Sequence, residues 1–501
     1  MSDVRVVLDS RFTIGEVDRR LFGSFVEHMG RCVYGGIYEP GDPLADETGV
    51  RKDVLALTEE LGVTAVRYPG GNFVSNYRWE DGVGPREHRP VRRDLAWRSI
   101  ETNQFGLDEF VDWARRAHVE PMMAINLGTR GVAEALDLLE YANSAPGTAL
   151  ADLRVAHGHR DPHDVRLWCL GNEMDGPWQM GHKTADEYGR LAQETGRAMK
   201  RLDPTVELVA CGSSNAEMPT FGSWEATVLR HCYDVVDYVS LHAYYEPHDD
   251  DVRSFLASGA SMDRFIDGVV ATADHVRVAQ KHSKRINLSF DEWNVWYQGD
   301  FPGEDALDWE VAPRLIENAF TVTDAVVVGG LLISLLNHSD RVSMACQAQL
   351  VNIIAPIRAE SGRPAWRQTV FHPFAGTAAN ARGTALRAAV EAPTTVTAEH
   401  GTVPVVDVAA TTTGDGRSAV FLVNRRPDEP ISVELELAHL GAIAAAEHTV
   451  ISDADPQARN TVDEPDRVVP TTREVTRLDA GRLAVTLPPA SWNMITVTHG
   501  K

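Results

Sequence analysis

The sequence predicts an α/β protein that consists of a (β/α)8 TIM barrel followed by an antiparallel β-sandwich of jelly-roll-like form. Three observations carry this prediction. Short apolar runs alternate with helical segments from about residue 20 to residue 340. The GxGxxG and GxxxxGK[ST] fingerprints of nucleotide-binding doubly wound sheets are missing. After about residue 380 the apolar runs are short, rich in β-branched residues and separated by turn signals.

Eight apolar runs are the predicted barrel strands. Continuously apolar strands are typical of a parallel sheet that helices cover. The segments between them carry apolar residues at three- and four-residue steps, the pattern of amphipathic helices, as at Leu107–His118, Ala185–Leu202 and Met262–His282. Eight such units favour a closed barrel. The runs are Leu21–Val26, Thr64–Tyr68, Pro121–Leu127, Val165–Leu170, Val206–Cys211, Val236–Ala243, Ile286–Phe290 and Val326–Leu336.

The C-terminal part of the chain supplies the predicted sandwich. The first strand of the chain, Val4–Leu8, precedes the barrel and is expected to join it, whereas the polar, proline-containing segment Asp453–Asp466 is expected to be a surface loop. We therefore expect a barrel domain over residues 18–375 and a sandwich over residues 1–17 plus 376–501. The predicted sandwich strands are Val403–Thr411, Ser418–Asn424, Ile431–Leu437 and Arg482–Leu487.

Composition excludes two classes of partner. The chain has 48 Lys and Arg against 72 Asp and Glu, a formal net charge of −24. Because nucleic acids and anionic membranes bind basic surfaces, we expect neither as a partner. The longest apolar stretch, Ala325–Leu336, is too short to span a bilayer, and Met1–Gly15 carries charges where a signal peptide is apolar. Five scattered cysteines without a CxxC pair favour reduced thiols and a cytoplasmic protein.

Two carboxylates follow predicted strands at the end where a (β/α)8 barrel builds its active site. Glu173 follows the fourth strand and Glu292 the seventh. A single glutamate at such a position is often solvated or paired in a salt bridge. A pair of carboxyl groups in one pocket, however, is what glycoside hydrolysis requires, and the amide of Asn172 beside Glu173 can bind a sugar 2-hydroxyl.

Other chemistries find less support in the sequence. His28, His242 and His338 are placed at strand ends, but no HxH or HxxxH spacing joins them, so we expect neither a metal nor a cofactor. The acidic run at residues 249–251 lacks the alternating ligands of a calcium loop. A Schiff-base aldolase needs a lysine at a strand end, and no predicted strand ends in one. A non-catalytic carbohydrate-binding barrel would keep the tryptophans and lose the carboxylates.

Five stretches of the chain resemble glycoside hydrolase family 51, the α-L-arabinofuranosidases, within the larger clan of retaining (β/α)8 glycoside hydrolases. They extend over the whole predicted barrel in the order of that family, and the β-rich tail resembles its C-terminal sandwich. The stretches are Phe22–Gly30 (FGSFVEHMG), Arg67–Asp81 (RYPGGNFVSNYRWED), Trp168–Gln179 (WCLGNEMDGPWQ), Ser240–Tyr244 (SLHAY) and Ser289–Tyr297 (SFDEWNVWY).

The resemblance implies a role for each matching residue. Glu173 matches the general acid/base, Glu292 the nucleophile and Tyr244 the tyrosine that orients the nucleophile. Arg67 is expected either to offset the charge of Glu27, a third carboxylate in the pocket, or to form a purely structural ion pair. The residues expected to bind or surround the substrate are Glu27, Arg67, Gly71, Asn72, Trp97, Asn172, Trp178, His242, Trp296 and Gln349.

The function that the resemblance implies is an exo-acting, retaining α-L-arabinofuranosidase. Such an enzyme removes terminal non-reducing residues from oligosaccharides of arabinan or arabinoxylan by double displacement. The resemblance also implies a homo-hexamer. A β-D-xylosidase or an endoglucanase on the same framework stays open as an alternative, as do the preferred linkage (1,2, 1,3 or 1,5) and transglycosylation.

Overall fold

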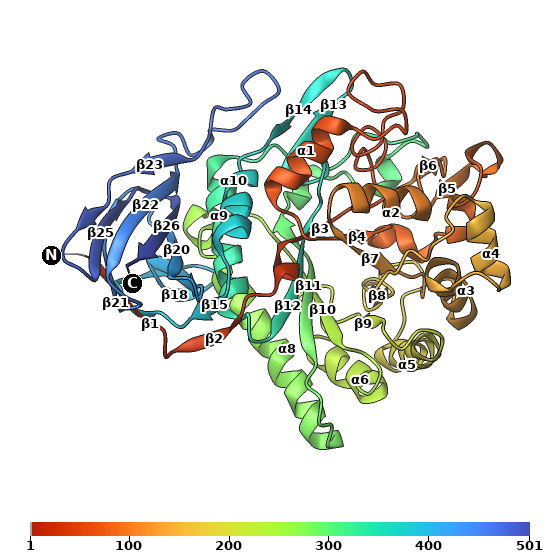
Figure 1. The fold of residues 1–501 in the computed structure, drawn as a ribbon, viewed down its shortest axis with the longest axis horizontal. Helices are drawn as coiled ribbons and strands as arrows, with labels where there is room; N and C mark the ends of the chain where they lie inside the picture. The colour runs from red at the N-terminus through yellow and green to blue at the C-terminus, as the bar shows by residue number, and fades with distance from the viewer. Residues whose placement is uncertain (1–2, 501) are drawn as a thin grey trace.

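The barrel in the first three quarters of the chain is closed and parallel. The structure is a computed structural model that describes residues 3–500. Eight strands close around one axis in chain order (Figure 1). This arrangement confirms the predicted (β/α)8 barrel. The strands are β3 (Gly23–Phe25), β4 (Ala65–Tyr68), β7 (Glu120–Ala124), β8 (Leu167–Leu170), β9 (Glu207–Ala210), β10 (Tyr238–Tyr245), β11 (Asn287–Val295) and β12 (Val342–Ala348).

The prediction of the eighth strand was wrong. Val326–Leu336 lies inside helix α9 (Val322–Asn337), and the eighth strand is β12. Every residue of α9 from Val322 to Leu336 is buried, because the helix packs against the barrel on one side and the sandwich on the other. A helix buried all round shows no polar face, and its sequence then looks like a buried strand. Asn337 and His338 consequently end a helix and not a strand.

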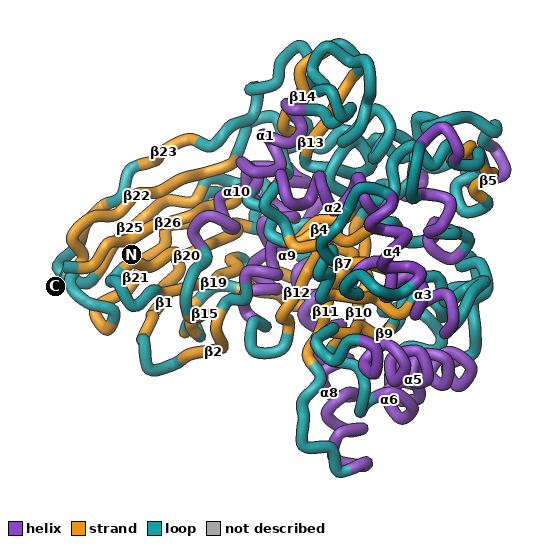
Figure 2. Tube along the Cα trace, turned by 45° about the vertical axis from the view of Figure 1, so that its right-hand side comes forward, coloured by secondary structure: helices purple, strands orange, loops and turns teal. Residues whose placement is uncertain are grey.

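Helices surround the barrel strands, as Figure 2 shows. Helices α2, α5 and α8 coincide with the three amphipathic segments predicted from the sequence. The helix that follows β8, α5, begins at a capping box in which Thr184 and Glu187 bond to each other's backbone N–H. The other helices of the barrel part are α1 (Lys52–Leu61), α2 (Leu107–Arg116), α3 (Val132–Asn143), α4 (Ala149–Ala156), α5 (Ala185–Leu202), α6 (Ser223–Cys232), α7 (Val252–Phe255), α8 (Gly259–Gln280) and α10 (Phe371–Asn380).

The remaining strands form a sandwich of two mainly antiparallel sheets. One has five strands, β16 (Ala389–Glu391), β1 (Val4–Asp9), β21 (Ile431–His439), β25 (Arg482–Leu487) and β24 (Thr476–Arg477). The other has seven, β2 (Thr13–Glu16), β15 (Thr384–Leu386), β19 (Val406–Thr412), β20 (Arg417–Asn424), β26 (Ser491–His499), β22 (Ile443–Ile451) and β23 (Thr471–Arg473). Strand β1 joins the first sheet by a parallel pairing with β21, which confirms that the N-terminal strand belongs to the sandwich.

Three short hairpins extend from the two domains. The predicted strand Val403–Thr411 is divided between β18 and β19, and β18 belongs to one of these hairpins. The segment Asp453–Asp466 links β22 to β23 and contains neither a helix nor a strand, as expected of a surface loop. The hairpins are β5 (Arg92–Asp94) with β6 (Ser99–Glu101), β13 (Ile357–Glu360) with β14 (Arg363–Arg367), and β17 (Thr394–Thr397) with β18 (Gly401–Pro404).

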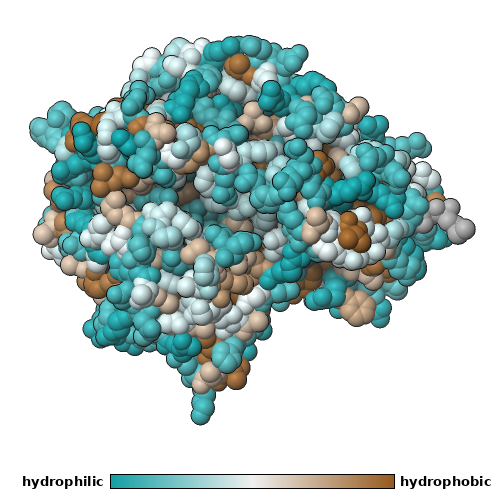
Figure 3. Space-filling view, turned by 180° about the vertical axis from the view of Figure 1, so that it is seen from behind, coloured by the Kyte–Doolittle hydropathy of each residue, from teal (hydrophilic) through white to brown (hydrophobic). Residues whose placement is uncertain are grey.

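The surface is largely hydrophilic. Polar side chains cover most of the face in Figure 3, and hydrophobic residues are scattered over it. Within residues 3–500, no helix combines the length and the apolar character that crossing a membrane requires.

Trp492 joins the sandwich to the barrel through two glycines. It lies on β26, is buried, and fits against Gly329 of α9 and Gly376 of α10. A Cβ atom at Gly329 would lie 2.1 Å from Cδ1 of Trp492, whereas a Cβ at the neighbouring Gly330 meets nothing closer than Asp407 Oδ2 at 3.9 Å. Helices α9 and α10 stand between the two domains in Figure 1.

This contact predicts that two adjacent glycine-to-alanine substitutions change the free energy of unfolding differently. Gly329→Ala should lower the free energy of unfolding by about 1–3 kcal/mol, because the methyl group forces Trp492 or α9 to move. Gly330→Ala should leave it unchanged or raise it by up to about 1 kcal/mol, since alanine favours the helix. Thermal unfolding of both variants checks this prediction. Equal melting temperatures would contradict the packing described here.

Candidate active site

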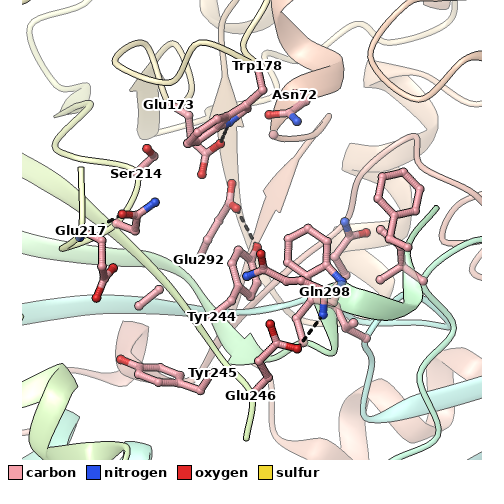
Figure 4. A pocket seen from close by; sticks show the side chains of 18 of the residues that line it. Asn72, Glu173, Trp178, Ser214, Glu217, Tyr244, Tyr245, Glu246, Glu292 and Gln298 are labelled. Atoms are coloured by element: carbon pink, nitrogen blue, oxygen red, sulfur yellow. Dashed lines mark hydrogen bonds between the residues drawn. The ribbon is translucent and has the colours of Figure 1, made fainter. Parts of the chain in front are cut away.

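A cavity of about 680 Å³ opens at the C-terminal ends of the barrel strands. Ten of the residues predicted from the sequence line it, together with residues of the neighbouring loops (Figure 4). The fold therefore brings these residues together from strands that are far apart in the sequence. The ten are Glu27, Gly71, Asn72, Trp97, Glu173, Trp178, Tyr244, Glu292, Trp296 and Gln349.

Glu173 and Glu292 face each other in this cavity. Glu173 follows β8 on a left-handed backbone with φ of 42°, and Glu292 lies within β11. One carboxylate oxygen of each lies within 4.8 Å of the other. Retaining glycosidases have carboxyl groups about 5–5.5 Å apart, whereas inverting enzymes need about 6.5–9.5 Å to admit a water. The separation fits direct attack by one of the two carboxylates.

Glu292 is held by two donors. Arg67 Nη1 donates to Oε1 at 2.6 Å, and the Tyr244 hydroxyl donates to Oε2 at 2.8 Å. Burial raises the pKa of Glu292, and the positive charges of His242 and Arg67 oppose that rise. Burial and the charge of Glu292 raise the pKa of Tyr244 well above its ordinary value, so its hydroxyl keeps the proton that it donates. The two oxygens of Glu292 are thereby fixed in orientation.

Glu173 has different partners. The indole Nε1 of Trp178 donates to Oε2 at 2.6 Å, and Nδ1 of His242 lies 2.9 Å from Oε1. Trp178 is 48% exposed, so this side of the cavity opens to solvent. A carboxyl group at the open side is well placed to reach the oxygen of a leaving group.

His242 connects the two carboxylates to a third, Asp291. Its Nε2 lies 2.9 Å from Asp291 Oδ1, and its Nδ1 lies 3.6 Å from Glu292 Oε2. Burial alone would lower the pKa of His242, but the charge of Glu292 and the hydrogen bonds to Asp291 and Glu173 raise it to about 10. His242 is therefore a cation at neutral pH, and it offsets part of the negative charge of the site.

Sequence reasoning missed Asp291. Neighbouring residues of a regular strand point to opposite faces, so Asp291 and Glu292 should not reach the same histidine. The pairing of β11 with β12 shifts register between Phe290 and Trp293, and its pairing with β10 shifts near His242. These irregularities bring both carboxylates to His242. The adjacent Asp-Glu pair was visible in the sequence, but the irregular strand was not.

Arg67, Asn172 and His242 lie behind the carboxylates, outside the set of residues that line the cavity. Arg67 Nη2 donates to Asn172 Oδ1 at 2.6 Å, so one guanidinium bridges Asn172 and Glu292. Gly71 packs onto the same pair, and a Cβ atom there would lie 3.0 Å from Glu292 Oε1. The ion pair of Arg67 is therefore with Glu292, at 2.6 Å, and the expected pairing with Glu27 is not what the structure shows.

Glu27 is a third carboxylate in the cavity, and it is surrounded by donors. It accepts hydrogen bonds from the backbone N–H of Phe73 at 3.0 Å and from Trp97 Nε1 at 2.9 Å, while Gln349 Nε2 donates to its other oxygen at 3.1 Å. Burial raises its pKa to about 8 despite these bonds. Gln349 directly follows β12, the true eighth strand.

The aromatic residues occupy three parts of the cavity wall. Trp97 is buried beside Glu27, Trp178 covers Glu173, and the ring of Trp296 stands edge-on to Tyr244 at 5.1 Å. Aromatic faces of this kind stack against the apolar faces of sugars.

The histidines considered as metal ligands lie apart. His28 is bonded to Glu101 at 2.8 Å and Tyr68 at 2.7 Å, whereas His338 ends α9 and lies 3.6 Å from Asp263. Two groups of described residues have the geometry of metal ligands, one made of Glu173, His242 and Glu292, the other of Asp108, His159 and His163. In the first group, His242 and Glu173 already bond to each other, and the two glutamates also accept hydrogen bonds from Trp178 and Tyr244.

The charge of His242 predicts a change in pH dependence. His242→Asn removes a cation that favours ionised Glu292, so the pKa of Glu292 should rise further. With Glu292 as the predicted nucleophile, which must be ionised to attack, activity should be lost at a higher pH on the acidic side. The pH profile of kcat/KM measures this shift. His163→Asn, which disrupts a buried histidine bonded to Asp108 at 2.8 Å, should leave the profile unchanged. If the pH profiles of His242→Asn and the unmodified protein fall at the same pH on the acidic side, His242 does not influence the ionisation of Glu292.

Comparison with known proteins identifies the family. A model of the α-L-arabinofuranosidase 1 domain matches residues 57–260, and a model of the α-L-arabinofuranosidase C-terminal domain matches residues 291–491. The chain is similar to an intracellular exo-alpha-(1->5)-L-arabinofuranosidase of Streptomyces lividans, with 59% identity over 99% of this chain and 75% of that protein. It is also similar to an exo-alpha-(1->6)-L-arabinofuranosidase of Bifidobacterium longum, with 50% identity over 99% of this chain and 98% of that protein.

Solved structures agree with the sequence comparison. The structure of a family 51 α-L-arabinofuranosidase from Bifidobacterium longum superposes with a TM-score of 0.95 at 48% identity, and the match covers 99% of this chain and 100% of that chain. These findings confirm the resemblance predicted from the motifs around Glu173 and Glu292. The chain belongs to family 51 of the glycoside hydrolases, the family of the α-L-arabinofuranosidases.

Proposed function

We propose that this protein is an exo-acting, retaining α-L-arabinofuranosidase that removes terminal non-reducing residues from arabinan- or arabinoxylan-derived oligosaccharides. Its family makes it a glycoside hydrolase, and the relatives reported above are named as exo-acting arabinofuranosidases. The observation that carries the retaining mechanism is the separation of Glu173 and Glu292, whose nearest carboxylate oxygens lie within 4.8 Å of each other.

The two carboxylates divide the reaction between them. Ionised Glu292 attacks the anomeric carbon while protonated Glu173 gives its proton to the glycosidic oxygen, so one C–O bond forms as the other breaks. The product is an arabinosyl ester of Glu292 and a free leaving group. Glu173, now ionised, takes a proton from water, and that water attacks the anomeric carbon and releases Glu292. Tyr244 keeps the nucleophile in position throughout.

The other cavity residues hold the sugar. Glu27 and Gln349 lie within hydrogen-bond distance of each other and are proposed to bind arabinofuranose hydroxyls together with Asn72. Asn172 is proposed to bind the 2-hydroxyl, with Arg67 fixing its amide. The remaining proposed contacts are the backbone at Gly71, the aromatic rings of Trp97, Trp178 and Trp296, and His242 acting through Glu173.

Three further properties are proposed, two from the relatives and the family and one from strand pairing. The Streptomyces relative is named as intracellular, and we propose that this chain acts in the cytoplasm on short oligosaccharides. We also propose the homo-hexamer that the family resemblance implies. The domain boundaries are proposed at residues 18–375 for the barrel and 1–17 plus 376–501 for the sandwich, because β1 and β2 pair with sandwich strands.

A panel of aryl glycosides tests the proposed function. We expect hydrolysis of p-nitrophenyl α-L-arabinofuranoside and little hydrolysis of the β-D-xylopyranoside or the β-D-cellobioside. Arabinobioses linked 1,2, 1,3, 1,5 and 1,6 then define the linkage, since similar relatives are named for different linkages. Activity on a xyloside or a cellobioside without activity on the arabinofuranoside would overturn the proposal. Binding of arabino-oligosaccharides without hydrolysis of any substrate would indicate a carbohydrate-binding protein instead.

A further inference from the structure

The cavity continues beyond the catalytic pair into a region that the proposed mechanism does not use. A cavity of about 680 Å³ is in the range that holds drug-sized ligands and exceeds what a single pentose requires. Tyr244 points to Glu292, whereas the next residue, Tyr245, is directed away from it (Figure 4). We call this region the outer compartment. Its residues are Tyr245, Ser258, Ser261, Phe265, Glu399 and His400.

The sandwich domain supplies one wall of the outer compartment. Glu399 and His400 lie at the tip of the hairpin formed by β17 and β18. This hairpin comes after the barrel in the sequence, yet its tip lines the cavity at the open end of the barrel. The hairpin is held there by two contacts. The backbone N–H of Glu399 donates to Ser254 Oγ at 3.2 Å, and Arg264 of α8 bonds to His400 Nδ1 at 3.2 Å.

The contact with Arg264 determines what His400 offers to a ligand. Arg264 can only donate, so His400 Nδ1 accepts and the proton of the neutral ring resides on Nε2. Burial and the positive charge of Arg264 lower the pKa of His400, which keeps the ring neutral at physiological pH. Its Nε2 lies 4.0 Å from Glu399 Oε2. A donor and a carboxylate acceptor therefore stand side by side.

The rest of the outer compartment combines hydroxyl groups with aromatic surface. Tyr245 and Ser261 line the cavity, and the hydroxyl of neither makes a hydrogen bond to another residue within residues 3–500. Phe265 is buried and lies edge-on to Phe221 at 5.2 Å, which fixes its ring. The partly exposed ring of Tyr245, beside a donor and an acceptor, matches a sugar, whose ring has apolar faces and a polar edge.

The negative charge of the outer compartment favours neutral sugars over acidic ones. Arg264 is already bonded to His400, so the carboxylate of Glu399 is the charged group that the outer compartment presents, and that of Glu246 lies elsewhere on the wall of the same cavity. An acidic sugar such as a uronic acid would be repelled by these groups. The chemistry therefore fits neutral sugar residues.

We infer that the outer compartment is a binding subsite for the leaving-group part of an extended neutral oligosaccharide, so that the sandwich domain takes part in substrate selection through the β17–β18 hairpin. The inference rests on the proposed function. Sugar residues beyond the one next to the scissile bond occupy the outer compartment and bond to His400 and Glu399.

Chain-length dependence tests this inference. The substrates are 1,5-linked arabinobiose, arabinotriose and arabinotetraose, with p-nitrophenyl α-L-arabinofuranoside as a substrate that lacks further sugars. We expect kcat/KM of the unmodified enzyme to rise about tenfold from biose to tetraose, as two or three added hydrogen bonds allow. The double variant Glu399→Gln, His400→Ala should lose that gain and hydrolyse the aryl arabinofuranoside within about twofold of the unmodified enzyme.

A control on the same hairpin separates binding from general damage. Val396 of β17 is 73% exposed and does not line the cavity, so Val396→Ala should keep the full gain with chain length. Melting temperatures of both variants report whether the hairpin still folds. Equal kcat/KM for all chain lengths in the unmodified enzyme, or an equal loss on every substrate in the double variant, would overturn the inference. Failure to hydrolyse the aryl arabinofuranoside at all would overturn the proposed function and this inference with it.

Discussion

Glu292→Ala is expected to lower kcat by more than about 10⁴-fold, which corresponds to at least about 5 kcal/mol of transition-state stabilisation. Glu292 is 95% buried, as its relative exposure of 5% shows, and both of its oxygens are held by Arg67 and Tyr244. The methyl group of alanine can neither attack the anomeric carbon nor offset the positive charge that develops on the sugar. Both steps of the double displacement therefore fail.

Azide gives this prediction a distinctive readout. In Glu292→Ala a small anion can enter the space of the lost carboxylate and attack the substrate directly, so an activated α-arabinofuranoside should give the β-azide. Glu217, an exposed glutamate on the wall of the same cavity, supplies the control. Glu217→Ala should keep its activity within about threefold, as expected for a surface substitution. Substantial turnover by Glu292→Ala without azide would remove Glu292 from the role of nucleophile.

Glu173→Ala should show a loss that depends on the leaving group. For arabino-oligosaccharides, kcat/KM should fall by about 10²–10⁴-fold, because the departing sugar oxygen needs a proton. For the 2,4-dinitrophenyl arabinofuranoside, whose leaving group needs no proton, kcat/KM should stay nearly unchanged. Its kcat should fall, since the second step loses the base that activates water.

Azide again distinguishes the two carboxylates. In Glu173→Ala the arabinosyl ester of Glu292 still forms, and azide attacks it from the face that Glu173 occupied, so the product should be the α-azide. The opposite anomers from the two variants would assign one role to each residue. Equal losses on the activated and the unactivated substrate would contradict a proton-donating role for Glu173.

Most of the fold could be predicted because most barrel strands lie in short, buried, largely apolar runs of the sequence. Seven of the eight predicted runs overlap a strand of the closed barrel. The exception, Val326–Leu336, is part of a helix enclosed by two domains. The local pattern of apolar residues does not reveal how many sides of a segment its neighbours cover. Helix α9 is apolar all round because the sandwich covers the side that in an ordinary barrel helix meets water.

The candidate site was predictable to the extent that it depends on the ends of strands. Glu173 follows β8, and Tyr244 and Glu292 lie in the second halves of β10 and β11, just after the apolar runs that predict these strands, so their convergence followed from the barrel. Asp291 escaped prediction, because only an irregular strand brings it to the same face as Glu292. The role of Glu399 and His400 in the cavity wall also escaped it, since they reach the barrel from a separate domain.

The stereochemistry of the reaction tests the central claim most directly, which is that Glu292 and Glu173 act as a retaining pair. Hydrolysis of p-nitrophenyl α-L-arabinofuranoside in water containing methanol, followed by proton NMR, reports the configuration of the methyl glycoside, which does not change after it forms. We predict methyl α-L-arabinofuranoside from the unmodified enzyme, by methanol attack on the arabinosyl ester of Glu292. Formation of methyl β-L-arabinofuranoside would show a single inverting displacement and contradict this account.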